Sequence, residues 1–129
     1  MTTPKDYMFS TTHEWINFLE DGTALTGLTD FAQKSLSDLV FINMPSKGDE
    51  ITCGEAYADI ESVKAVADIN CLASGVIIET NENIADEPGK INEDPYGSWI
   101  IKIGDISEKA ELMNAEDYDK FCEEEEENE

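Results

Sequence analysis

The chain is divided into short β-prone runs separated by turn-forming residues, and this pattern constrains its fold more than any other feature. Trp15–Leu19 and Thr23–Leu28 flank an Asp-Gly pair, which is a hairpin signal. Further β-prone runs lie at residues 39–44, 56–63, 65–72, 75–80 and 99–103. Short strands at this close spacing predict a mainly β protein, built as a small flattened barrel or sandwich.

Helical signals are confined to short segments. Thr29 is a good N-cap for a short helix over residues 29–34. Residues 81–97 contain Pro88-Gly89 and Pro95, and we expect a long ordered loop there. Apolar residues recur at helical spacing between acids over residues 112–122, which predicts one or two short amphipathic helices on the edge of the sheet.

The charge balance excludes several classes of partner. Thirty acidic residues face eight lysines, with no arginine, and give a net charge of −22. Nucleic acid and anionic membranes are disfavoured, because little here could neutralise phosphate. The chain of 129 residues is long enough for one domain, and its high charge favours a monomer. It shows no apolar span of membrane-crossing length and no secretory leader, so we expect an intracellular protein.

The last residues form a like-charge block. Residues 123–127 are all glutamate, and such a run repels itself. We therefore expect a folded domain over residues 1–122 and a disordered acidic tail over residues 123–129.

The residues needed for common enzyme chemistries are missing from the sequence. Cys53, Cys71 and Cys122 form no CxxC pair and no zinc-ligand pattern, which favours ordinary reduced thiols. No nucleophile-elbow, phosphate-loop or calcium-loop motif is present, and His13, the one histidine, is read as a structural residue before a strand. These observations favour a carrier over an enzyme.

A single lysine interrupts the apolar and acidic stretch DIESVKAVADI, which runs from Asp59 to Ile69. The runs on either side of Lys64 mirror each other, which indicates a strand, a tight reversal and a second strand. Lys64 then lies at an exposed hairpin tip. That position suits a modified lysine better than a Schiff-base lysine, which needs a pocket that lowers its pKa.

The sequence resembles the H-protein family of the glycine cleavage system over residues 7–122. The resemblance is carried by motifs in a fixed order: His13-Glu14-Trp15, Gly27-Leu28-Thr29-Asp30-Phe31-Ala32-Gln33, Asp38-Leu39-Val40-Phe41, Gly54-Glu55, Ile60-Glu61-Ser62-Val63-Lys64-Ala65, Ser74-Gly75, Asn92-Glu93-Asp94-Pro95-Tyr96-Gly97 and Trp99-Ile100-Ile101-Lys102-Ile103. The chain departs from the family at Leu72, where a proline is usual, and in a loop after Tyr96 that is one residue shorter.

The resemblance implies a fold, a cofactor and site residues. The fold would be a lipoyl-domain-like barrel-sandwich hybrid with a C-terminal helix, so that residues 1–122 form a lipoyl-carrier domain. Lipoate would be attached to Lys64 through an amide. Glu61, Ser62, Val63 and Ala65 would be recognised by the lipoylating enzymes. Glu14 and Asp68 are candidates to hold the cationic end of the loaded arm by charge-assisted hydrogen bonds.

The same resemblance implies partners and a location. The carrier would take an aminomethyl group from a pyridoxal-phosphate glycine decarboxylase to a tetrahydrofolate-dependent aminomethyltransferase. A flavin-containing dihydrolipoyl dehydrogenase would then reoxidise it. The location would be cytoplasmic, or the mitochondrial matrix for a mature eukaryotic form. Three alternatives stay open: an H-like paralogue, a lipoyl carrier of a different enzyme set, and an unmodified acidic interaction module.

Overall fold

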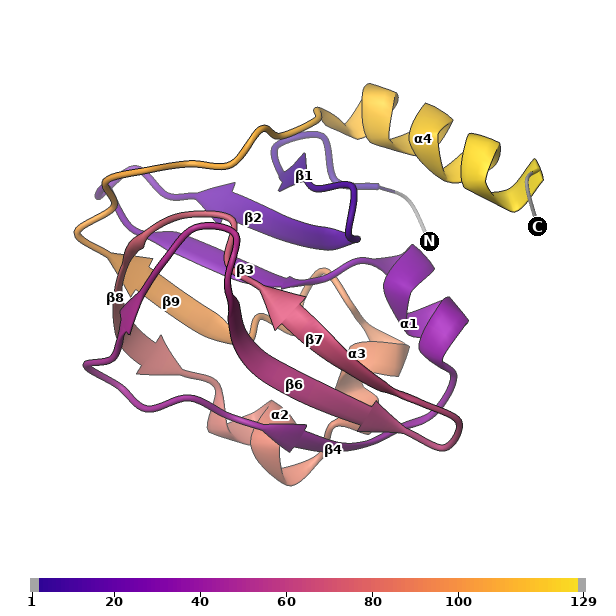
Figure 1. Ribbon diagram of the computed structural model, residues 1–129, viewed down its shortest axis with the longest axis horizontal. Helices are drawn as coiled ribbons and strands as arrows, with labels where there is room; N and C mark the ends of the chain where they lie inside the picture. The colour runs from indigo at the N-terminus through magenta and orange to yellow at the C-terminus, as the bar shows by residue number, and fades with distance from the viewer. Residues whose placement is uncertain (1–2, 128–129) are drawn as a thin grey trace.

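The computed structural model describes residues 3–127, which form two antiparallel sheets with short helices around them (Figure 1). The larger sheet has six strands in the order β1-β2-β3-β9-β8-β5. Their bounds are β1 Met8–Phe9, β2 Glu14–Phe18, β3 Ala24–Leu28, β5 Glu50–Ile51, β8 Gly75–Thr80 and β9 Ile101–Gly104. The two-residue strands β1 and β5 were not predicted, because they are too short to show a periodic pattern.

The smaller sheet carries the lysine hairpin. It consists of β4 (Leu39–Asn43), β6 (Ala56–Ser62) and β7 (Val66–Asn70), in the order β4-β6-β7. The β6–β7 hairpin projects from the body of the molecule at the lower right of Figure 1, below helix α1 (Asp30–Leu36).

One hydrophobic core joins the two sheets. Ile16 and Ile103 of the larger sheet and Ile60 and Ile69 of the smaller one are fully buried in the same cluster. Burying an isoleucine side chain contributes about 2 kcal/mol, so this cluster is a main source of stability. The prediction of a mainly β protein is confirmed, and the described strands form a sandwich of two separate sheets instead of a closed barrel.

Helix α1 starts where the sequence predicts it. The Thr29 hydroxyl accepts a hydrogen bond from the amide of Ala32 at 3.2 Å, which caps the first turn. The same hydroxyl lies 2.7 Å from the hydroxyl of Tyr118, so the cap also connects α1 to the C-terminal helix.

Residues 81–97 contain two helices that the loop prediction missed, α2 (Glu82–Asp86) and α3 (Gly89–Glu93). Each has five residues and each buries one isoleucine, Ile84 or Ile91. The two prolines suggested a loop, but Pro88 immediately precedes α3, where its fixed φ is compatible with a helix start.

The prediction of a disordered tail is wrong for residues 123–127, which are helical. The predicted C-terminal helix is confirmed as a single helix, α4 (Ala115–Glu127), which continues through the first residues of that tail. Residues 128–129 lie outside the described residues. Its first turn is capped by Asn114, whose side-chain oxygen accepts from the amide of Asp117 at 2.8 Å. The Tyr118 side chain of α4 is buried against Phe9, and this packing offsets the repulsion among the glutamates.

Candidate functional site

Lys64 lies at the exposed tip of the β6–β7 hairpin, as the sequence predicts. Glu61 pairs with Val66, and the amide of Ser62 donates to the carbonyl of Ala65 at 2.8 Å, which closes the turn. The Ser62 hydroxyl oxygen accepts from the amides of Lys64 at 3.2 Å and Ala65 at 3.0 Å. These bonds fix the backbone at the tip, while the lysine side chain stays exposed for another protein to reach.

A small cavity of about 160 Å³ lies between α1, the β1–β2 turn and the smaller sheet. Its lining is apolar on most sides, with two carboxylates among it: Thr12, His13, Glu14, Leu28, Ala32, Ser35, Leu36, Ile60, Ala67 and Asp68. The structure therefore brings Glu14 and Asp68, which are far apart in the chain, to one cavity.

Glu14 is a buried carboxylate, with only 1% of its surface exposed. The hydroxyls of Ser10 and Thr12 donate to its Oε1, the former at 2.7 Å. The backbone and side-chain amides of Asn70 donate to its Oε2 at 3.2 and 3.3 Å. Burial raises the pKa of the Glu14 carboxyl above its ordinary value, although these hydrogen bonds oppose the shift.

Asp68 differs from Glu14 in its surroundings. It lies on β7 directly opposite Asp59 of β6 and is exposed to solvent. Glu14 thus forms a fixed, buried acidic wall of the cavity, whereas Asp68 is an exposed acid at its margin. A carboxylate in an apolar setting can hold one ammonium group by a charge-assisted hydrogen bond.

A second hollow, of about 370 Å³, lies beside Lys64. It is lined by Phe31, Lys34, Ser35, Lys64 and Glu126. Ser35 lines both hollows, so the two lie next to each other at this residue of α1.

His13 is a site residue that sequence reasoning assigned only a structural role. Its side chain lines the cavity beside Glu14, and its ring stacks on Phe31 with centroids 4.2 Å apart. Its backbone has a φ of 69°, an uncommon conformation for a residue with a side chain. The sequence signal that could have indicated a role for His13 in the site is its position next to Glu14.

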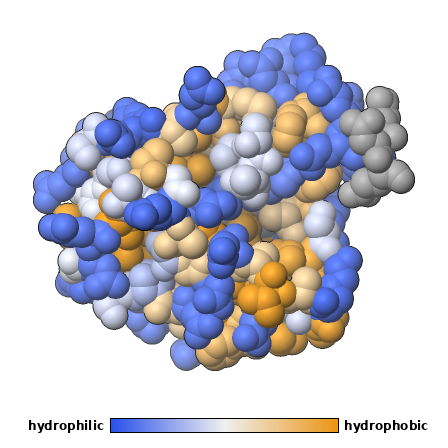
Figure 2. Space-filling model, viewed as in Figure 1, coloured by the Kyte–Doolittle hydropathy of each residue, from blue (hydrophilic) through white to orange (hydrophobic). Residues whose placement is uncertain are grey.

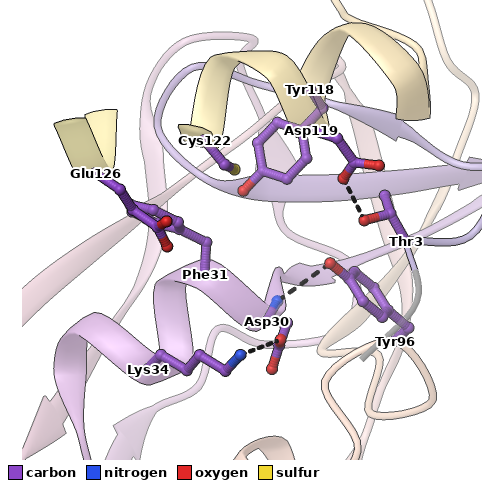
Figure 3. Close-up of a pocket in the computed structure, with 9 residues that line it drawn as sticks. All are labelled: Thr3, Asp30, Phe31, Lys34, Tyr96, Tyr118, Asp119, Cys122 and Glu126. Atoms are coloured by element: carbon purple, nitrogen blue, oxygen red, sulfur yellow. Dashed lines mark hydrogen bonds and ion pairs between the residues drawn. The ribbon is translucent and has the colours of Figure 1, made fainter. Parts of the chain in front are cut away.

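Helix α4 holds His13 in place. The Nδ1 of His13 lies 2.7 Å from the hydroxyl of Tyr118, and its Nε2 lies 2.8 Å from Oε2 of Glu125. Figure 3 shows how α4 faces α1 in this region: Tyr118 and Cys122 point from α4 toward the side of α1 that carries Phe31. The C-terminal helix therefore supports one wall of the cavity.

Two other classes of site find no support in residues 3–127. No group of histidine, cysteine and acidic side chains in this part of the chain is arranged to hold a metal ion. No described helix is long and apolar enough to cross a membrane.

An exposed lysine on a fixed hairpin tip, near a largely apolar cavity that contains two carboxylates, is the arrangement expected of a carrier with an attached arm. The comparisons agree with that class. The family model described as glycine cleavage H-protein matches residues 7–125, and the chain belongs to this family.

Relatives of this chain share about half of its residues over most of their length. The glycine cleavage system H protein of Lachnoclostridium phytofermentans is 49% identical and covers 94% of this chain and 95% of its own length. That of Carboxydothermus hydrogenoformans is 48% identical, with 95% of each covered. A crystal structure of the H protein from Mycobacterium marinum superposes with a TM-score of 0.86 at 35% identity, covering 91% of this chain and 96% of the other.

Proteins of this family carry lipoate covalently on a lysine and are the lipoyl carriers of the glycine cleavage system. They interact with glycine decarboxylase, aminomethyltransferase and dihydrolipoyl dehydrogenase. The predicted family, cofactor type and enzyme partners are therefore confirmed, as is the prediction of a carrier subunit instead of an enzyme. The alternative of an unmodified acidic interaction module is set aside by the same matches.

Proposed function

We propose that Lys64 is the lysine that carries the lipoyl group in this chain. The observation that carries the proposal is the fixed, exposed tip, in which Ser62 holds the backbone and the lysine side chain alone is left to move. An amide forms when the ε-amine attacks an activated lipoyl carbonyl, the activating group leaves, and the amine loses a proton. This step removes one positive charge from the tip.

The residues around Lys64 would serve recognition. Glu61 and Val66 form the strand pair nearest the turn of the hairpin. Val63 and Ala65 are exposed on either side of the lysine. Ser62 shapes the turn through its hydroxyl. We propose that the lipoylating enzymes read these four residues, namely Glu61, Ser62, Val63 and Ala65.

When attached, the lipoyl group supplies a dithiolane sulphur that accepts the aminomethyl unit in the glycine cleavage reaction. The contribution of this chain is to bind and shield the loaded end. Glu14 would accept hydrogen bonds from its ammonium group, and the apolar residues of the cavity would exclude water. Asp68 would add a second negative charge at the margin. The presence of both carboxylates in the lining of one largely apolar cavity supports this assignment.

A cytoplasmic location is proposed as well. It is supported by the bacterial sources of the relatives that cover most of this chain.

The attachment site can be tested by intact mass and peptide mapping after incubation with a lipoate ligase, lipoate and ATP. We expect one lipoyl group on the parent, mapped to Lys64, and none on Lys64→Ala. Lys34→Ala is the matched control, because Lys34 lines the same hollow and is also exposed. A group attached to another lysine, or no group on a folded parent, would contradict the proposal.

A further inference from the structure

The inward-facing side of α4 carries an acidic side chain. Buried and half-buried residues recur along this helix at helical spacing, namely Ala115, Tyr118, Phe121, Cys122 and Glu125. Figure 2 shows mostly hydrophilic surface at the upper right edge, where Figure 1 places α4, and hydrophobic surface below it. Among residues 115–126, Glu125 is the one acid that is not exposed, and its partner is His13.

A chain of hydrogen bonds runs from Glu125 to the start of α1. Oε2 of Glu125 lies 2.8 Å from Nε2 of His13, whose Nδ1 lies 2.7 Å from the Tyr118 hydroxyl. That hydroxyl lies 2.7 Å from Oγ1 of Thr29, which accepts from the amide of Ala32 at 3.2 Å. The chain therefore joins three parts of the fold, which are α4, the β1–β2 turn and α1.

The hydrogens in this chain can be assigned from its two ends. An ionised Glu125 can only accept, so Nε2 of the neutral His13 ring carries the hydrogen and Nδ1 is left as an acceptor. The Tyr118 hydroxyl then donates to Nδ1, and the Thr29 hydroxyl donates to Tyr118. Burial raises the pKa of Tyr118, which keeps its hydroxyl protonated and able to donate. Every hydrogen of the chain has an acceptor in this direction.

The other neutral tautomer of His13 does not fit. A hydrogen on Nδ1 would set the lone pair of Nε2 against the Glu125 carboxylate, 2.8 Å away. It would also reverse the chain, so that Tyr118 donates to Thr29. The Thr29 hydroxyl, which is fully buried, would then have no acceptor among the described residues, and an unpaired donor is costly to bury.

Tyr118 connects two walls of the cavity of Glu14 and Asp68 from outside it. His13 lines the cavity from the β1–β2 turn, and Ala32 lines it from α1. The Tyr118 hydroxyl bonds to His13 on one side and to the cap of α1 on the other. One hydroxyl group therefore fixes how far the imidazole ring lies from the start of α1.

We propose that Tyr118 is a positioning residue for the loaded arm: its hydroxyl holds the His13 ring against the start of α1 and so sets the width of the cavity. The inference rests on the proposed function, in which this cavity shields the amine end of the arm. Without the hydroxyl, the ring keeps one hydrogen bond, to Glu125, and its other edge can turn. Water then reaches the aminomethyl group more often, and the group is lost faster.

The first test reads the tautomer of His13 in the unmodified protein. The chain has one histidine, so labelling with ¹⁵N-histidine gives a single pair of ring nitrogen signals in an NMR spectrum. At about pH 8 the ring is mostly neutral, and we expect hydrogen on Nε2 and none on Nδ1. In Tyr118→Phe we expect the Nδ1 signal to move toward that of an unbonded nitrogen. Hydrogen on Nδ1 in the parent, or an unmoved Nδ1 signal in the variant, would overturn the inference.

The second test measures how fast the loaded arm loses its one-carbon unit. Lipoylated protein is loaded by glycine decarboxylase and glycine, separated from both, and followed by intact mass. We expect Tyr118→Phe to lose the unit about five-fold faster than the parent. Tyr7→Phe is the matched control, because its hydroxyl donates to the carbonyl of Tyr96 at 3.1 Å and Tyr7 does not line the cavity. Equal rates for the parent and Tyr118→Phe would contradict the positioning role.

A third variant separates positioning from the general packing of α4. Phe9 is fully buried and stacks on the Tyr118 ring with centroids 4.7 Å apart, so Phe9→Leu weakens this packing and keeps the hydroxyl. We expect Phe9→Leu to lower the melting temperature at least as much as Tyr118→Phe and to lose the one-carbon unit at the rate of the parent. If Phe9→Leu speeds the loss as much as Tyr118→Phe does, α4 has only a structural role and the inference is wrong.

The inference and the proposed function fail in different ways. If the parent is loaded at Lys64 and Tyr118→Phe keeps the one-carbon unit as long as the parent, the positioning role is wrong and the attachment site stands. If the parent gains no lipoyl group at Lys64, the proposed function is wrong and the positioning role falls with it. The tautomer of the parent tests the inference even if Tyr118→Phe does not fold.

Discussion

Glu14 and Asn70 connect the two sheets at one carboxylate oxygen. The backbone amide of Asn70 donates to Oε2 of Glu14 at 3.2 Å, and the Asn70 side chain donates to the same atom at 3.3 Å. Glu14 belongs to β2 of the larger sheet and Asn70 to β7 of the smaller one. The residue proposed to hold the loaded arm is therefore also a polar contact between the two layers.

Glu14→Gln tests the first of these roles. The substitution keeps the shape of the side chain and removes its charge, so the ammonium group of the loaded arm loses a charge-assisted hydrogen bond worth about 2 kcal/mol. We expect the amine-loaded protein to lose its one-carbon unit about ten-fold faster or more, as followed by intact mass. Glu61→Gln is the control, because Glu61 does not line the cavity. Equal rates for the parent and Glu14→Gln would contradict the assignment.

The same variant tests the pH dependence of stability. Burial raises the pKa of Glu14 in the folded state above its ordinary value of 4.5, so the folded state binds more protons than the unfolded state just above pH 4.5. Glu14 then stabilises the fold fully below pH 4.5, and this contribution is lost as the pH rises through the higher folded-state pKa. We expect the free energy of unfolding of the parent to fall relative to Glu14→Gln over that interval.

Urea unfolding of the two proteins at a series of pH values gives this difference. Other carboxyl groups titrate in both proteins, so the subtraction isolates Glu14. A difference that stays constant, or that changes in favour of the parent as the pH rises, would show that the pKa of Glu14 is not raised.

Glu125→Ala tests the attachment of α4 to the cavity wall. The variant removes the contact with Nε2 of His13, whose side chain is 13% exposed, while that of Glu125 is 39% exposed. We expect a loss of about 0.5 kcal/mol in the free energy of unfolding and faster amide hydrogen exchange in α4. Glu124→Ala removes the same charge from an exposed neighbour and should change neither. The prediction is wrong if the two variants behave alike.

Gly75 and Gly89 offer a matched pair of glycine substitutions. A Cβ on Gly75 would clash with the carbonyl oxygen of Gly104 on the paired strand β9, whereas a Cβ on Gly89 would meet nothing within 4 Å. We expect Gly75→Ala to lower the free energy of unfolding by about 2 kcal/mol or more, because backbone must move. Gly89→Ala, in α3, should leave it unchanged or raise it by about 0.5 kcal/mol. Thermal unfolding of both variants measures these changes. Similar changes in the free energy of unfolding for the two variants would contradict the close approach at Gly75.

The three thiols should react at different rates. Cys71 is 2% exposed, and burial raises its pKa to about 12, so it is both shielded and rarely ionised at neutral pH. Cys53 and Cys122 are partly exposed, although burial raises their pKa values too. We expect Cys71 to be alkylated last when the native protein is treated with iodoacetamide and mapped by mass spectrometry. Labelling of Cys71 as fast as the other two would contradict its placement in the core.

The sequence predicted correctly those parts of the fold that depend on interactions between residues close together in the chain. The Asp21-Gly22 turn, the Thr29 cap and the lysine hairpin all depend on residues that are neighbours in sequence, and the structure has each of them. Helices α2 and α3 were missed because each depends on burying a single isoleucine in a core built by distant strands.

The candidate site divides in the same way. Lys64 could be placed at the tip from its own flanking residues. Glu14 and Asp68 came from the family resemblance, since only the stacking of the sheets brings them to one cavity. The contact between His13 and Glu125 joins residues 112 positions apart in the sequence and depends on where α4 packs. It could not be predicted, because the run of glutamates suggested a disordered tail at the place where the structure has α4.

The hydrogen bonds of Ser62 at the hairpin tip have a geometric consequence for the whole carrier. They give the Cα of Lys64 a fixed position, so an arm attached there, as proposed, can reach only points that lie within its extended length of that atom. Every catalytic centre that the arm serves must then come within this one distance when the carrier is docked. Enzymes of unrelated folds would therefore share the same upper limit on the depth of their catalytic centres below the docked surface.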